Sequence, residues 1–280
     1  MRKRKLEELL FKILMLLATG LVGLCLFLIV GTILIKGLPY LSWEMISKVP
    51  DGGYYFGRSG GMLNAIIGSF YIAGGATLMG IFISIPVSIY LNVYLKKSNR
   101  FAKFAKLSFD VLFGIPSIVY GAFAFSIMVY LGVRASLLGG IIAVTLLVIP
   151  ILVRTLDEVM IQIPKDLKEA ALSLGATRWE MAKVIIRQIR PGILTAVLLA
   201  FGRGVGDVAA VMFTAGFSDN IPVSLHEPAA TLPLAIFFQL GSPIPEVQGR
   251  AYASALILTI FILIIVVMST ILTNKRKKRS

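Results

Sequence analysis

The chain has 280 residues, of which 57% are hydrophobic, and 28 lysines and arginines against 14 acids give a formal net charge of +14. Soluble domains are typically about 45–50% apolar, so this composition indicates a membrane protein and argues against a water-soluble enzyme. One cysteine and one histidine exclude an intrachain disulfide and a zinc site built from several cysteines or histidines of this chain.

Six segments are candidate membrane spans, because a helix that crosses a bilayer needs about 20 mostly apolar residues. They are 13–35, 62–94, 107–131, 137–153, 191–215 and 252–272. The first follows the basic sequence MRKRK, yet it is longer than the apolar region of a signal peptide and no small-residue cleavage site follows it, so we expect a retained span. The third contains Pro116, which we expect to kink it. The sequence therefore predicts an all-α membrane protein with six transmembrane helices.

The positive charges are unevenly divided between the two sides that six spans define. The two terminal tails and the loops after the second and fourth spans carry 21 lysines and arginines, the other side carries five, and Arg154 and Arg203 lie in or near spans. Cytoplasmic loops are enriched in these residues, so both termini are predicted to be cytoplasmic. Since no nucleic-acid-binding motif accompanies the charge, we expect lipid and no nucleic acid as a partner.

We divide the chain into three regions. Residues 1–61 hold the N-terminal tail, the first span and an outer loop, residues 62–273 form the transmembrane core, and residues 274–280 are a basic tail. In the outer loop before the last span, residues 232–240 are apolar but too short to cross, so we expect them to lie at the interface or to re-enter partway.

A stretch of soluble character, residues 165–187, lies between the fourth and fifth spans on the predicted cytoplasmic side. Pro164 is suited to the start of a helix, and Asp166 and Glu169 follow in its first turn, where the helix dipole favours acids. Gly175 interrupts the pattern, which predicts two short amphipathic helices with a bend. These features alone fit a solvated connector as well as a docking element.

The spacing within EAALSLGATRWEMAKVI resembles the EAA loop of ABC-importer permeases, whose Glu-Ala-Ala, glycine and isoleucine fall on Glu169, Ala170, Ala171, Gly175 and Ile185. The resemblance implies the type I importer permease fold, also called MetI-like. It also implies that the loop docks in a groove of a cytoplasmic ATPase, where the alanines permit close approach, the glycine permits the bend and the glutamate meets basic groups.

The chain contains no Gly-x-x-x-x-Gly-Lys-Ser/Thr loop, so we expect no ATPase site of its own. No cofactor is expected in this chain, since ATP and magnesium would bind the partner ATPase. The chain departs from the EAA pattern after Ile185, because Arg187 and Gln188 stand where the family has leucine and proline, and Pro191 comes slightly later.

Two charges in the fifth predicted span, Arg203 and Asp207, are four residues apart on one helix face. Arg203 would lie about 18 Å along a helix that begins at Pro191, near the middle of the bilayer. One interpretation is an internal ion pair, and the other is an oxyanion site, because guanidinium is suited to phosphate. An ionised Asp207 would accept a hydrogen bond from monoprotonated phosphate but not from sulfate, so the pair would favour phosphate.

The end of the fourth predicted span carries further charges. Arg154 either contacts substrate or only anchors the cytoplasmic edge of its helix. We expect Asp157 and Glu158 to face the cytoplasmic vestibule or to pair with Arg154, and Asp110 to cap the third span.

Four segments extend the resemblance to PstA-type permeases of phosphate ABC importers: GGMLNAIIGSF, FDVLFGIPSIVYG, VRTLDEVMIQIPKDLKEAALSLGATRWE and RGVGDVAAVMFTAG. The similarity covers about residues 60–273 and aligns the arginine of the family's fourth span with Arg154. The family motif Arg-x-x-Gly-Glu-Thr-Ala-Pro matches Arg203, Gly206 and Asp207, with a shorter acid and no proline, which leaves the carboxylate geometry open.

The resemblance implies a place in the plasma membrane of a bacterium or archaeon. It implies four partners: a PstC-like permease, two ATPase subunits and an extracytoplasmic phosphate-binding protein. The alternatives are a permease for another oxyanion or polar solute, an ion-driven secondary carrier, and a regulatory subunit that scaffolds a kinase.

Overall fold

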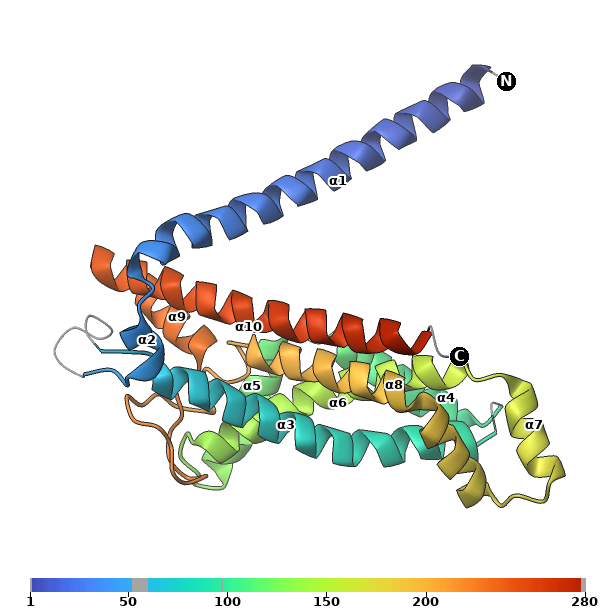
Figure 1. Cartoon of the computed structure of the whole chain (residues 1–280). Helices are drawn as coiled ribbons and strands as arrows, with labels where there is room; N and C mark the ends of the chain where they lie inside the picture. Colours follow the sequence, from blue (N-terminus) through green and yellow to red (C-terminus); the bar gives the residue numbers. More distant parts are fainter. Residues whose placement is uncertain (1, 52–59, 97, 278–280) are drawn as a thin grey trace.

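The computed structural model describes residues 2–51, 60–96 and 98–277, and the regular secondary structure of these residues is helical (Figure 1). The elements are α1 (Arg2–Gly37), η1 (Leu38–Tyr40), α2 (Trp43–Ser47), α3 (Leu63–Ile89), η2 (Tyr90–Tyr94, a π-helical turn), α4 (Arg100–Phe113), α5 (Ser117–Tyr130), α6 (Leu137–Ile161), α7 (Lys165–Ser173), α8 (Arg178–Val205), α9 (Leu232–Leu240) and α10 (Pro245–Lys277).

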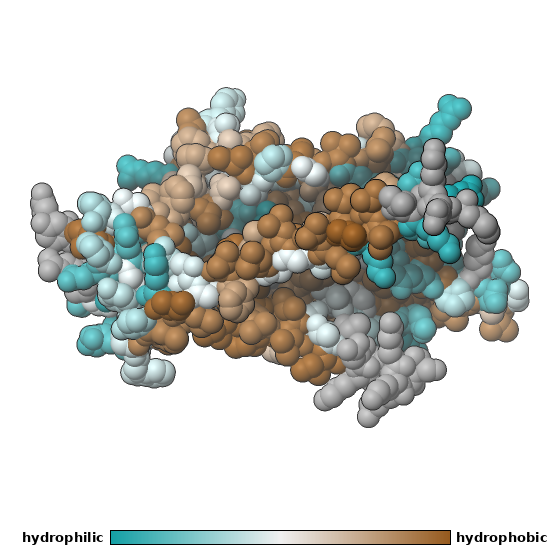
Figure 2. All heavy atoms as spheres, turned by 90° about the horizontal axis from the view of Figure 1, so that it is seen from above, coloured by the Kyte–Doolittle hydropathy of each residue, from teal (hydrophilic) through white to brown (hydrophobic). Residues whose placement is uncertain are grey.

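Within this described part, five unbroken helices are long and apolar enough to cross a membrane: α1, α3, α6, α8 and α10. The pair α4 and α5 is the sixth candidate, but its two helices are bent by 100° at the break. The predicted kink at Pro116 is therefore a complete break, since residues 114–116 leave the helical conformation. Apolar residues cover the middle of the molecule and hydrophilic residues gather at its two ends (Figure 2), as expected for six spans in a bilayer.

Several predicted span boundaries differ from the observed helices; for example, α6 extends to Ile161 and α10 begins at Pro245. The fifth was expected to begin near Pro191, but α8 begins at Arg178, continues through Pro191 and ends at Val205, so residues 206–215 form turns. The second of the two short cytoplasmic helices is consequently the first part of α8. At the C-terminal end, α10 continues to Lys277, so much of the predicted basic tail is helical, and residues 278–280 lie outside the described part.

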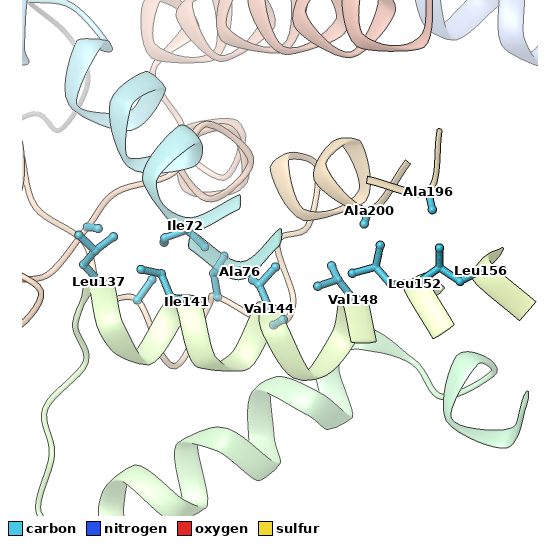
Figure 3. Packing of buried hydrophobic residues seen from close by; sticks show 14 residues of the cluster. Ile72, Ala76, Leu137, Ile141, Val144, Val148, Leu152, Leu156, Ala196 and Ala200 are labelled. Carbon is cyan, nitrogen blue, oxygen red and sulfur yellow. The ribbon is translucent and has the colours of Figure 1, made fainter. Parts of the chain in front are cut away.

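The core of the bundle forms around α6, which packs against α3 and α8 (Figure 3). Leu152 of α6 is fully buried beside Gly80 of α3, where an added Cβ atom would lie 2.9 Å from Leu152 Cδ1. Ala196 and Ala200 present the small face of α8 to the same cluster. Small residues permit close packing of helices in lipid, where burial of apolar area contributes little because the surroundings are equally apolar.

Helix α1 contacts the bundle near its C-terminal end and leans away from it elsewhere (Figure 1). Gly37 lies against the backbone of Tyr252 in α10, and the Lys36 ammonium lies 5.0 Å from the centre of the Tyr252 ring. Tyr40 lies against Gly249. The start of α1 and the end of α10 both point toward the end of the molecule that carries α7 (Figure 1).

Replacing Gly68 of α3 with leucine is expected to separate α3 from the loop before α9, because an added Cβ atom would overlap the carbonyl oxygen of Ala230. Overpacking of this kind typically costs about 1–3 kcal/mol. Gly74→Leu in the same helix is the matched control, since its added Cβ meets nothing within 4 Å. Thermal unfolding in detergent should show a lower Tm for Gly68→Leu alone, and equal Tm values would contradict the packing described.

Candidate functional site: the end of helix α8 and the coupling segment

Helix α8 ends inside the bundle rather than at its surface. Gly204 packs against Val144 of α6 and Ala73 of α3, where an added Cβ would lie 3.2 Å and 3.4 Å from their side chains. Val144 is seven residues from the start of α6, which corresponds to about 10 Å of helix. The α8 end therefore lies well inside the apolar belt, on the side of the molecule away from α7.

Asp207 holds the chain at this break. Its residue is 4% exposed, and its Oδ2 accepts a hydrogen bond of 2.8 Å from the backbone N–H of Ala210. Beyond it, the N–H of Met212 donates to the carbonyl of Val208. The carboxylate thus caps a new turn after α8 has ended, as an aspartate does at the start of a helix.

The internal ion pair, one of the two interpretations of these charges, is present: Arg203 Nη2 lies 3.4 Å from Asp207 Oδ1. The two partners differ in exposure, since the Arg203 side chain is 50% exposed and that of Asp207 is 3% exposed. One carboxylate oxygen therefore orients the guanidinium and the other holds the backbone. The half-exposed guanidinium has a planar fork of donors that is suited to an oxyanion.

The face of α8 that carries Arg203 differs from its other faces. Ala196, Ala200 and Gly204 face α3 and α6, and Gly202 and Gly206 lie near isoleucines of α10. Arg203 lies outside both contacts. A guanidinium directed into hydrocarbon costs about 2.5–3.5 kcal/mol or more. This face is therefore expected to adjoin water or a partner subunit rather than lipid.

Arg154 belongs to a separate cluster. Its side chain forms ion pairs with Asp110 at 3.3 Å and with Glu158 at 3.5 Å, and its guanidinium carbon lies 4.9 Å from the centre of the Phe113 ring. The expected pairing with Glu158 is thus confirmed. The predicted cap at Asp110 is wrong, because this residue lies within α4 and its carboxylate faces Arg154.

The structure does not bring Arg154 to Arg203. Gly204, next to Arg203, lies beside Val144, which precedes Arg154 by ten residues, or about 15 Å of helix α6. Asp157 pairs instead with Lys106 of α4 at 2.6 Å. Arg154 and Asp157 therefore join α6 to α4 at the end of the bundle nearer α7.

The coupling segment, residues 165–187, forms α7, a bend and the start of α8. Gly175 has φ +78°, a conformation that glycine adopts without strain, so the predicted bend is confirmed. Thr177 caps α8: its hydroxyl oxygen accepts from the N–H of Glu180, whose carboxylate accepts from the N–H of Thr177. This reciprocal capping box fixes the direction in which α8 leaves the bend.

All five predicted docking residues lie in this segment, but only four of them are accessible to a partner. Glu169, Ala170 and Gly175 are exposed and Ala171 is half-buried. Ile185 is 2% exposed and packs with residues of α6 and η2 in a cluster that includes Met160, Met181 and Val93. Its side chain therefore anchors the segment to the bundle and does not offer a surface to a partner.

Two exposed apolar residues of this segment were not predicted as docking residues. Leu174 is 89% exposed and Trp179 is 57% exposed, on either side of Gly175. Leu174 could have been identified from the sequence, because it is a large apolar residue directly before the bend glycine in a charged loop. Exposed side chains of this kind at a projecting bend are typical of a protein interface.

The chain is similar to known transport proteins over nearly its whole length. The family model described as "Binding-protein-dependent transport system inner membrane component" matches residues 84–278. The phosphate transport system permease protein PstA of Haemophilus influenzae is 36% identical over 262 residues, covering 92% of this chain and 90% of that protein. PstA of Pasteurella multocida is 35% identical over 282 residues, covering 98% and 97%.

A solved structure supports the fold independently. An inward-facing structure of the MetNI methionine ABC transporter contains a chain with a TM-score of 0.61 and 18% identity, covering 76% of this chain and 95% of that one. The MetI-like fold expected from the EAA loop is thereby confirmed. The chain therefore belongs to the binding-protein-dependent transport system inner membrane components, and among them to the PstA-type phosphate transport system permeases.

Proposed function

We propose that this multi-pass inner-membrane permease forms one of two transmembrane halves of an ATP-driven importer of inorganic phosphate. A PstC-like permease supplies the other half, two ATPase subunits bind on the cytoplasmic side, and an extracytoplasmic binding protein delivers phosphate. The observation that carries the proposal is Arg203, a half-exposed guanidinium in the apolar belt, held by a buried carboxylate. The assignment of phosphate as the transported anion rests on the relatives, which are phosphate transport system permeases.

Arg203 acts as a transient phosphate contact on the pathway between the two halves. Its orientation is fixed before the anion arrives, because Asp207 is itself held by the Ala210 N–H. The paired carboxylate also moderates the positive charge that the anion meets. This moderation favours transport, since a site that holds an ion too tightly does not release it.

Coupling to ATP hydrolysis takes place through the projecting segment around Gly175. Glu169, Ala170 and Ala171 enter the groove of the ATPase, and Leu174 extends the apolar part of this contact. Ile185 transmits the movement of the ATPase to the membrane spans, because it is packed against the ends of α6 and η2 and cannot shift without them. ATP closes the ATPase dimer, the two coupling segments approach each other, and the pathway opens outward.

The termini are cytoplasmic in this proposal, which the uneven distribution of lysine and arginine supports. A permease for another oxyanion is the nearest alternative, because Asp207 replaces the longer glutamate of the family motif. ATPase activity of the whole complex, measured with binding protein loaded with phosphate, sulfate or molybdate, separates these alternatives. Stimulation by the sulfate or molybdate form and none by the phosphate form would overturn the assignment of the substrate.

Arg203→Ala is expected to lower phosphate uptake by about 10- to 100-fold while the complex still assembles, because hydrogen bonds to charged groups contribute about 1.5–3 kcal/mol. Arg203→Lys should recover part of the rate, since it keeps the charge but not the forked donors. Arg134→Ala, an exposed arginine beyond α5, is the control. Radiolabelled phosphate uptake into vesicles is the measurement, and undiminished uptake would reduce Arg203 to an ion-pair partner.

Asp207→Asn and Asp207→Ala distinguish a positioning role from direct contact with phosphate. Asparagine keeps an oxygen for the Ala210 N–H, so its Tm should stay near the native value, whereas alanine should cost about 1 kcal/mol through loss of the cap. Both should raise the KM for phosphate, because Arg203 loses its orientation. If Asp207 instead selects phosphate by accepting a hydrogen bond from its proton, the Asp207→Asn variant should begin to transport sulfate. That result would contradict the positioning role.

Glu169→Lys should abolish ATPase stimulation by the binding protein and lower uptake by at least about tenfold, because juxtaposed like charges at an interface cost several kcal/mol. Membrane insertion should be unaffected, since Glu169 is exposed. The same reversal at Glu7, an exposed acid near the start of α1, is the control for net charge. ATPase activity and uptake of the reconstituted complex decide the matter, and normal coupling in Glu169→Lys would count against docking through α7.

A further inference from the structure

A cavity of about 460 Å³ lies at the α7 end of the molecule, between the end of η2, the start of α4, the end of α6 and α7. Two pairs of consecutive elements, η2 with α4 and α6 with α7, therefore form its wall. Its polar lining consists of Lys103, Lys106, Lys168 and Asn92, and six apolar residues complete it. The volume is within the range of small-molecule and headgroup sites.

The charge of the cavity is positive. Among the described residues that line it, none is an acid. Lys106 is compensated by Asp157, with Nζ 2.6 Å from the carboxylate, and it also donates to Asn92 Oδ1 at 2.9 Å. Lys103 is exposed at the mouth. Three lysines beside six apolar residues make a lining that is suited to an anion that carries apolar chains.

The surroundings of the cavity favour a lipid. Helix α4 turns 100° away from α5, so it does not continue along the direction of that span. It exposes Phe101, Phe104 and Leu107 at helical spacing on one face, while Lys103 and Lys106 lie on another. A helix with one face of aromatic and aliphatic residues and another of lysines is typical of the boundary between headgroups and acyl chains.

We propose that this cavity binds the headgroup of an anionic phospholipid, with its acyl chains against the apolar face of α4. The assignment of the lipid to the cytoplasmic leaflet rests on the orientation given in the proposed function. Basic pockets between transmembrane helices on this side of a membrane are suited to anionic headgroups. A free phosphate ion has the same charge chemistry but makes no use of the six apolar residues.

The site gives the bilayer a direct connection to the coupling segment. Lys168 lines the cavity and immediately precedes Glu169, the first residue of the predicted docking motif. A headgroup bound there joins α4 to α7 through shared contacts. The anionic lipid content of the membrane therefore affects how firmly α7 is held when the ATPase moves.

The test uses the complete transporter complex in nanodiscs of phosphatidylcholine with increasing phosphatidylglycerol. Bound phosphatidylglycerol is measured by native mass spectrometry. Lys103→Gln with Lys168→Gln should weaken its binding by about 25-fold, about fivefold for each lysine. Binding to the native complex should also weaken at 1 M salt, where the Debye length is about 3 Å. Lys12→Gln on α1, remote from the cavity, is the matched control and should leave binding unchanged.

Two further measurements on the native complex show whether the cavity binds a lipid or a free anion. They do not depend on assembly of the variant. A photoreactive phosphatidylglycerol analogue should label the native complex within residues 98–106 or 160–168, and labelling spread evenly over α1 and α10 would overturn the proposal. Inorganic phosphate should not displace the lipid, and saturable displacement by it would also overturn the proposal. Neither measurement involves uptake, so failure here is distinguishable from failure of the Arg203 pathway.

Discussion

The two oxygens of one buried carboxylate, that of Asp207, hold the guanidinium of Arg203 and the backbone N–H of Ala210. This interaction allows a charged side chain and an interrupted helix to exist together inside an apolar bundle. Hydrocarbon supplies no water, so the backbone groups of the turns after Val205 need partners from the protein. The carboxylate of Asp207 serves one of them, because it accepts from the Ala210 N–H, and it also orients Arg203.

The opposite end of the bundle uses charge for a different purpose. Ion pairs between α4 and α6 fix the helix that follows the sharp turn away from α5, and the buried Ile185 fixes the start of α8 against α6 and η2. The coupling segment is therefore exposed at its bend and rigidly based beneath it. A projecting element of this kind is suited to the coupling role proposed for it, because its base is packed against the spans.

Much of the fold follows from the apolar length of each segment, and the errors have local causes. The segment 191–215 is apolar enough to cross, but three glycines around Arg203 and the capping aspartate stop α8 at Val205. The predicted span began at Pro191 because the apolar run begins there, whereas α8 begins earlier, at the Thr177 capping box. Apolar length shows which residues lie in the membrane and does not show where the helix itself begins.

The sequence by itself determined which segments are apolar enough to cross a membrane, the uneven distribution of positive charge and the spacing of the coupling motif, because each depends on composition or on neighbours within a few turns. Only the tertiary structure decided that Ile185 is an anchor, that Asp207 serves Arg203 and the backbone together, and that Lys106 meets Asp157 from 51 positions away. The physical reason is that burial and ion pairing depend on which helices pack together. Several arrangements of six apolar helices satisfy the same hydrophobic pattern.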